Sequence, residues 1–114
     1  MLMVNYHNKV FQTIENSNNG ETSSSTKFHY RQVGQIVFAD YQGGNIQYGH
    51  LIGVVSEYGT IDMRYHQINT DGKLMTGTCE SIPEILPNGK VRLHESWQWT
   101  SGDLSKGKSI VEEI

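Results

Sequence analysis

Turn-forming residues interrupt this chain at seven places and divide it into eight strand-length segments. Almost every cluster contains glycine, and the clusters lie at residues 18–20, 33–34, 43–45, 58–59, 70–72, 87–89 and 101–103. Glycine and asparagine adopt positive φ at little steric cost, so hairpin turns select them. The stretches between the clusters alternate or are rich in β-branched and aromatic residues, which is typical of strands with one buried face. The pattern therefore predicts an antiparallel meander.

We expect the strands at residues 9–15, 27–32, 35–41, 46–55, 60–69, 73–82, 90–100 and 108–114. Strands joined by tight turns pair with their sequence neighbours, and closing the sheet removes its two open edges. The predicted fold class is all-β: a single antiparallel up-and-down meander closed into a small barrel of about eight strands, with residues 1–114 as a single β-barrel domain. No apolar stripe of helical period persists.

Two prolines, Pro83 and Pro87, mark the connection before the seventh predicted strand. Proline has no N–H to donate to a ladder, so it is confined to edge strands or strand ends. We expect residues 83–87 not to pair as a central strand, but to form a short edge segment or a helical turn.

The composition excludes several classes of function. The net charge is −3 and the nine Lys and Arg residues are scattered, so no basic field favours nucleic acid or anionic lipid. Cys79 is the only cysteine, which excludes an intrachain disulfide. The start lacks the pattern of a signal peptide, and the longest apolar run, Leu51–Val55, is far shorter than a membrane helix. We expect a soluble, cytoplasmic protein, bacterial in style, with no membrane or nucleic-acid partner.

Alternation assigns a face to each side chain, and we place the more apolar face of each strand inside. The predicted inward set includes nine residues with polar ends: Tyr30, Gln32, Tyr48, His50, Tyr65, Gln67, Glu95, Trp97 and Trp99. Such groups must bond one another, ordered water or a ligand when buried. An aromatic cavity with a few converging polar groups is typical of small-molecule sites. The alternative is that these rings lie near the barrel mouths with their polar atoms in water.

Glu95 is the most specific candidate for a functional residue, because Leu93 and Trp97 flank this carboxylate on an apolar face. Burial would raise the pKa of this carboxyl unless a donor or cation holds it charged. His50 or Tyr65 could supply that contact, and a Glu–His pair in a cavity could perform acid–base catalysis. The alternatives are a hydrogen-bonded pair that sets strand register, or a face misassigned near a bulge.

The remaining candidate groups indicate no metal or cofactor. The histidines form no close His-x-His or His-x-x-x-His pair, and they are His7, His29, His50, His66 and His94. We therefore predict no metal site and no cofactor. Trp97 and Trp99 share one face just before a polar loop, where they could close a cavity, enter an oligomer interface or pack in the core.

Three segments carry a resemblance to a known family: Gly59–Gln67, Leu74–Ser81 and Gly89–Asp103. They resemble a family of small uncharacterised bacterial proteins of about this length, whose members often carry the label N-acetylglutamate synthase, and the match spans nearly the whole chain. The resemblance implies that activity as an alternative function and assigns no active-site residues. The expected barrel is also similar to the lipocalin and avidin group, which implies a ligand cavity.

Three functional hypotheses follow. The preferred one is a barrel that binds a small, partly aromatic or polar molecule, lined by Tyr30, Tyr48, His50, Tyr65, Glu95 and Trp97. The second is an enzyme with Glu95 as acid or base, oriented by His50 or Tyr65. The third is a packed barrel that acts through its surface or as a homo-oligomer. The residues favour binding over catalysis and name no reaction.

Overall fold

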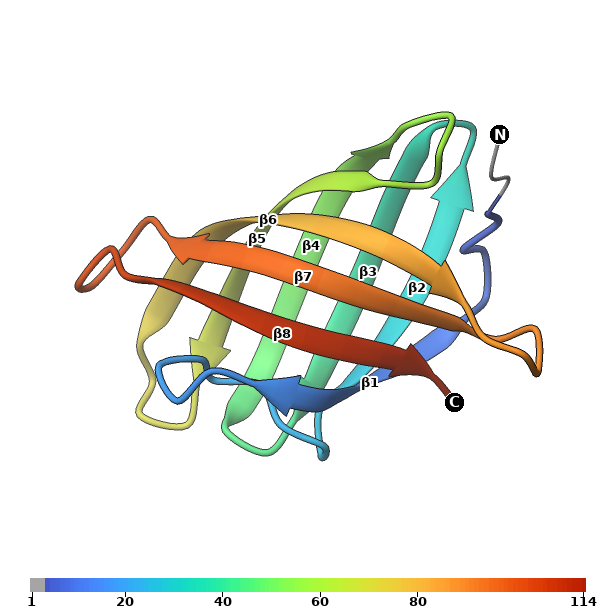
Figure 1. Cartoon of the computed structure of the whole chain (residues 1–114). Helices are drawn as coiled ribbons and strands as arrows, with labels where there is room; N and C mark the ends of the chain where they lie inside the picture. The colour runs from blue at the N-terminus through green and yellow to red at the C-terminus, as the bar shows by residue number, and fades with distance from the viewer. Residues whose placement is uncertain (1–3) are drawn as a thin grey trace.

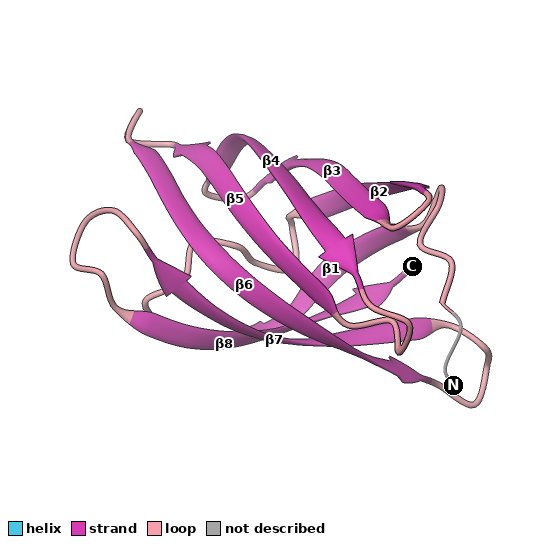
Figure 2. Ribbon diagram, turned by 90° about the horizontal axis from the view of Figure 1, so that it is seen from above, coloured by secondary structure: helices cyan, strands magenta, loops and turns pink. Residues whose placement is uncertain are grey.

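The computed structural model describes residues 4–114, which form eight strands closed into a barrel (Figure 1). The strands are β1 (Val10–Asn16), β2 (Lys27–Val33), β3 (Ile36–Gly43), β4 (Ile46–Val55), β5 (Ile61–Asn69), β6 (Leu74–Ile85), β7 (Val91–Trp99) and β8 (Lys106–Glu113). Each pairs antiparallel with the next, and β8 pairs with β1. Figure 2 shows only strands and loops in this part of the chain. The predicted all-β meander and its closure are confirmed.

The turn prediction is confirmed at all seven clusters. Every predicted cluster except residues 18–20 contains a glycine with positive φ, such as Gly34 at 60° between β2 and β3. Such a backbone suits the tight turns of hairpins. Residues 18–20 belong to a turn that Gly20 N closes by donating to Ser17 O at 2.9 Å, and this turn lies within a long loop, residues 17–26, that joins β1 to β2. We call it the β1–β2 loop.

Strand β6 continues past the expected end at Ile82 and includes Pro83, which pairs with Leu93 of β7. Leu86 N donates to Lys90 O, so by alternation Pro83 and Leu93 form a pair without ladder hydrogen bonds. The nitrogen of Pro83 therefore points away from β7, and pairing with β5 has already ended at Ser81. This part of β6 is therefore an edge segment, which was one of the two expectations. The predicted end at Ile82 was wrong, because the missing N–H of Pro83 removes no ladder hydrogen bond at this position.

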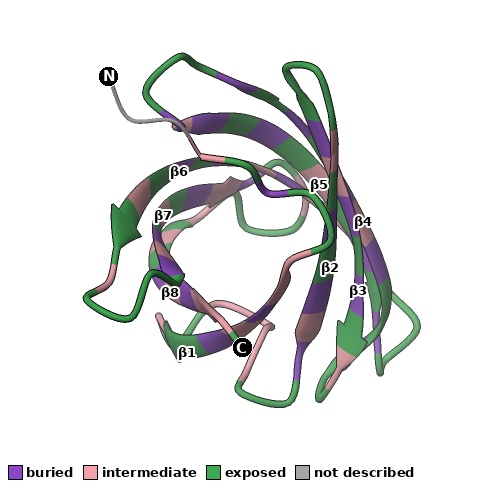
Figure 3. Cartoon of the chain, turned by 90° about the vertical axis from the view of Figure 1, so that its right-hand side faces the viewer, coloured by how far each residue is buried: buried purple, intermediate pink, exposed green. Residues whose placement is uncertain are grey.

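The predicted faces of β2, β5 and β7 are confirmed, and burial alternates along these strands (Figure 3). In β4 the prediction is right at Ile46 and Gln47 and wrong from Tyr48 onward. The register with β5 shifts between Ile46 and Tyr48, and this bulge reverses the alternation. Tyr48 is consequently 51% exposed on the outside, and Leu51 is buried.

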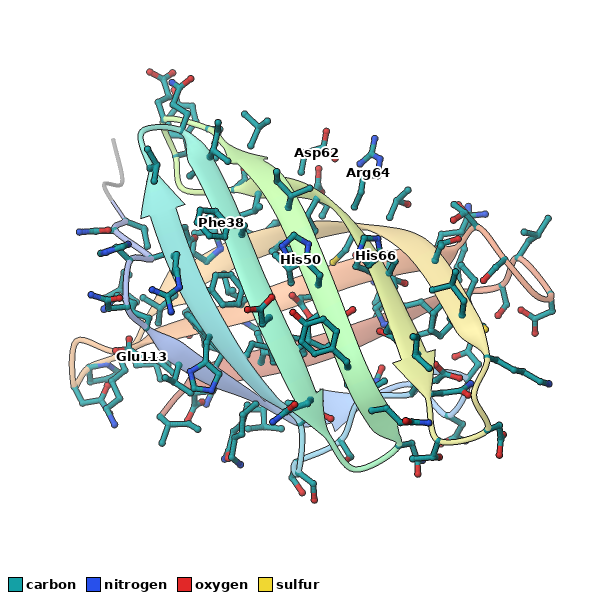
Figure 4. All side chains as sticks on the ribbon, turned by 180° about the vertical axis from the view of Figure 1, so that it is seen from behind. Phe38, His50, Asp62, Arg64, His66 and Glu113 are labelled. Atoms are coloured by element: carbon teal, nitrogen blue, oxygen red, sulfur yellow. The ribbon has the colours of Figure 1, made fainter. Side chains whose placement is uncertain are left out.

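His50 follows the same reversal and lies outside the barrel, where its ring stacks on His66 of β5 (Figure 4). The two ring centroids are 5.7 Å apart. Tyr48 donates a hydrogen bond to Asp40 Oδ1 at 2.9 Å on this outer face. The predicted inward positions of Tyr48 and His50 are therefore wrong.

The segment before β1 passes over one end of the barrel (Figure 3). Tyr6 is fully buried there and packs against Phe11 and Tyr30, with ring centroids 6.5 and 6.1 Å away. Its hydroxyl donates to Gly59 O at 2.5 Å, in the turn between β4 and β5. Tyr6 thus fastens the N-terminal segment to a distant turn and seals this end.

Replacing Tyr6 by alanine should reduce the free energy of unfolding by about 3–5 kcal/mol, the usual cost of truncating a buried aromatic side chain. Tyr58→Ala is the matched control, because Tyr58 is 59% exposed in the adjacent turn. We expect its effect to stay within about 0.5 kcal/mol. Denaturant unfolding of both variants measures the difference, and equal effects would contradict the role of Tyr6 as a seal.

Candidate functional site

A cavity of about 50 Å³ lies under the β1–β2 loop, at the end of the barrel opposite Tyr6. A buried water needs roughly 10–15 Å³, so the cavity has room for about four water-sized groups. Its apolar wall is mainly aromatic and consists of Phe28, Tyr41, Leu51, Met63, Tyr65, Cys79, Trp97 and Trp99. Its polar lining comprises Asn16, Glu21, Thr22, Gln67, Glu95 and Ser109, together with Gly20.

Three of the rings each lie over a glycine on the neighbouring strand. Tyr41 pairs with Gly49, Tyr65 with Gly77 and Trp97 with Gly107. A Cβ on any of these glycines would lie within 2.3 Å of the facing ring. Each ring therefore occupies the space that a side chain would otherwise fill, and lies along the wall instead of across the lumen. These glycines are inside a strand, so interpreting glycine as a turn signal misses them.

Glu95 on β7 is held by hydroxyls from both neighbouring strands. Ser81 Oγ of β6 and Ser109 Oγ of β8 each donate to one of its carboxylate oxygens at 2.9 Å. Burial raises the pKa of Glu95, and the two serine hydrogen bonds act in the opposite direction. The predicted inward position of Glu95 is confirmed, but its partners are serines, and His50 cannot reach it from the outer face.

Cys79 lies beside this carboxylate in the cavity wall. Burial, and next the negative charge of Glu95, raise the pKa of the Cys79 thiol well above its ordinary value. A thiol is a nucleophile only when ionised. Cys79 therefore behaves as an apolar wall residue at neutral pH.

The β1–β2 loop covers the cavity and is attached to the wall by side chains. Glu21 accepts hydrogen bonds from Gln67 Nε2 and Asn69 Nδ2, both at 2.8 Å. Trp99 Nε1 donates to Asn19 O at 3.0 Å. Glu21 was not among the predicted site residues, because its contacts join positions far apart in the sequence and no local pattern indicates them.

The predicted lining residues divide into three groups. Tyr65, Glu95 and Trp97 line the cavity. Tyr30 is buried but packs against Phe11, with ring centroids 4.8 Å apart, in the cluster at the closed end. Tyr48 and His50 lie outside, so the structure does not bring them to this cavity. The rings of Trp97 and Trp99 pack edge to face in the cavity wall, with their centroids 5.4 Å apart.

Residues 4–114 match the family model described as avidin-like protein. The chain belongs to the avidin-like family. The avidin part of the expected similarity is thereby confirmed, and it agrees with the closed eight-strand barrel. A search of curated proteins found no match.

Two further findings concern the described part of this avidin-like chain. Within residues 4–114, no group of three or more His, Cys, Asp or Glu side chains is arranged to hold a metal ion. The same residues contain no helix that is long and apolar enough to cross a membrane.

Glu95→Gln should stabilise the protein more at pH 8 than at pH 4. The pKa of Glu95 is raised above its ordinary value of 4.5, so the folded state holds this proton more tightly than the unfolded state does. Glu95 therefore favours folding below pH 4.5, and that contribution is lost as pH rises through the folded-state pKa. A difference of one between the pKa values in the folded and unfolded states changes the free energy of unfolding by about 1.4 kcal/mol.

Melting temperatures of wild type and variant across pH 4 to 8 measure this effect. The matched control is Glu80→Gln, which removes an exposed carboxylate from the outer face of β6. If the curves of wild type and Glu95→Gln run parallel, Glu95 titrates as a solvated carboxyl and its assigned environment is wrong.

Proposed function

We propose that this protein binds a small molecule in the cavity beneath the β1–β2 loop. The observation that carries the proposal is the lining itself: aromatic rings held against the wall surround a buried carboxylate at Glu95. Concave sites with apolar walls and a few oriented polar groups are the usual form of small-molecule sites. Membership of the avidin-like family supports a role of this kind for the barrel.

The geometry suits a compact ligand, or the compact end of a longer one. The room for about four water-sized groups accommodates a group of only a few non-hydrogen atoms. The wall is rigid because its rings lie on strands that are paired on both sides. The β1–β2 loop is attached by hydrogen bonds that wall side chains donate to the Glu21 carboxylate and to Asn19 O. Moving the β1–β2 loop away from the barrel wall breaks no pairing between strands. We therefore infer that ligands enter by displacement of this loop.

Acid–base catalysis by Glu95 is a second candidate, favoured by the upward displacement of its pKa inside a cavity. His50 has no part in it, because it lies outside the barrel. For the N-acetylglutamate synthase label we find no support in the site: acetyl-CoA pyrophosphate is commonly bound at a helix N-terminus, and residues 4–114 contain only strands and loops. Binding without turnover remains the better-supported function.

Leu51→Phe should abolish binding, because Leu51 lines the cavity and a larger side chain would fill it. Ile52→Phe is the matched control, since Ile52 is the next residue on β4 and is 51% exposed on the outer face. The probe set is a panel of amines, alcohols, carboxylic acids and small aromatic compounds of at most about ten non-hydrogen atoms. Both tryptophans of the chain line the cavity, so their fluorescence reports occupancy.

We expect at least one compound to bind wild type and Ile52→Phe equally and Leu51→Phe at least tenfold more weakly. A ligand at 100 times its Kd should also stabilise wild type by about 2.7 kcal/mol, visible as a higher melting temperature. If no compound binds, or if Leu51→Phe binds as wild type does, the proposed function is rejected.

A further inference from the structure

We propose that the ligand of this cavity is a small organic cation, an ammonium or guanidinium group that lies among the aromatic rings and against Glu95. The inference rests on the proposed function and adds the chemical class of the ligand. Three features of the lining lead to it: its charge, its rings and its hydrogen-bonding groups.

The charge of the lining is entirely negative. Glu21 and Glu95 are its two charged side chains, and it contains no Lys, Arg or His. The four ion pairs formed within residues 4–114 involve other carboxylates, those of Asp62, Glu84, Glu112 and Glu113. A buried carboxylate without a cation is energetically unfavourable. A cationic ligand would compensate that charge, whereas an anionic one would be repelled.

The aromatic rings of the lining are a second source of attraction for a cation. The ring centroid of Trp99 is 5.4 Å from that of Trp97 and 5.8 Å from that of Tyr65, both in edge-to-face geometry. The ring centroids of Phe28 and Tyr41 are 4.7 Å apart. All five rings line the cavity. The face of an aromatic ring carries partial negative charge, and a cation within about 6 Å of the ring centroid is attracted, more strongly when water is excluded. Aromatic walls combined with a carboxylate favour a cation over a neutral molecule of the same shape.

The hydrogen-bonding groups near the cover supply acceptors. Asn16 Oδ1, in the cavity wall, has no hydrogen-bond partner among the described residues, whereas Asn16 Nδ2 already donates to Thr22. Each oxygen of Glu95 accepts one serine hydrogen bond and has a further lone pair. An ammonium or guanidinium group has only donors. A guanidinium, with four non-hydrogen atoms, also matches the room in the cavity.

Cation binding should compete with protonation of Glu95. The other titratable groups that face Glu95 are Tyr30, Tyr41, Tyr65, Cys79 and, on the covering loop, Glu21. Burial raises the pKa of the three tyrosines and of the thiol, so these four stay neutral at physiological pH. The affinity for a cation should therefore weaken by about tenfold per pH unit once pH falls below the pKa of Glu95.

The test compares probes of one shape and different charge. Guanidinium, urea and acetate are planar with four non-hydrogen atoms each, and tetramethylammonium and tert-butanol form a branched pair of five non-hydrogen atoms each. Each is titrated at millimolar concentration and constant ionic strength into wild type, with tryptophan fluorescence and calorimetry as readouts. The variants are Glu95→Gln, which removes the charge at similar shape, and Glu80→Gln, which removes an exposed carboxylate instead. Leu51→Phe reports whether binding occurs in the cavity.

We expect a cation to bind wild type and Glu80→Gln at least tenfold more tightly than its neutral counterpart, and the anion not to bind. Glu95→Gln and Leu51→Phe should each weaken the cation at least tenfold. If Glu95→Gln does not fold, the charge series and the pH dependence on wild type decide.

Equal or tighter binding of the neutral or anionic probe overturns the cation assignment, as does cation binding that Leu51→Phe leaves unchanged. A neutral or anionic compound that Leu51→Phe excludes would overturn the cation assignment and leave the proposed function standing. If neither the cations nor any compound of the broader panel binds, both proposals fall.

Discussion

The pairing of β8 with β1 is the interaction on which the other features of this structure depend. It joins Phe11 to Glu113 and Asn16 to Ser109, with a register shift between Thr13 and Glu15. Without it the meander would have two open edges, and the alternate faces of its strands would not converge on one lumen. β7 pairs with β6 and β8 through the meander itself, and Glu95 stands opposite Ser81 and Ser109, so it receives one hydroxyl from each neighbour.

The two ends of the lumen differ in the way they are filled. At one end Tyr6 inserts from the N-terminal segment and packs against the rings of Phe11 and Tyr30. At the other end, glycines opposite Tyr41, Tyr65 and Trp97 allow the rings to lie along the wall. In these three pairs the neighbouring position has no side chain, and the ring takes its place against the wall. Glycine opposite an aromatic residue therefore helps to keep the middle of the lumen free at this end.

Glu95 connects stability with the proposed function. Within residues 4–114 the partly buried carboxylate of Glu95 has two hydroxyl partners and no ion-pair partner, and its ionisation weakens the folded state. Groups of this kind are commonly found where a protein binds or reacts with something. The same charge that is unfavourable in the empty barrel would attract a cation, and Glu21 on the covering loop adds to it. In this view the loss of stability and the selectivity of the site have one origin.

The sequence by itself determined the turns, the antiparallel order and the inward faces of β2, β5 and β7, because positive-φ glycines and period-two alternation are local properties. It also placed Tyr65, Glu95 and Trp97 at the cavity. Only the tertiary structure decided the face of β4, since the bulge before Tyr48 arises from pairing with β5 and moves His50 outside. The serine partners of Glu95 follow from the exact register of β7 with β6 and β8, and the position of Glu21 follows from packing of the β1–β2 loop against β5. Neither is a local property of the sequence.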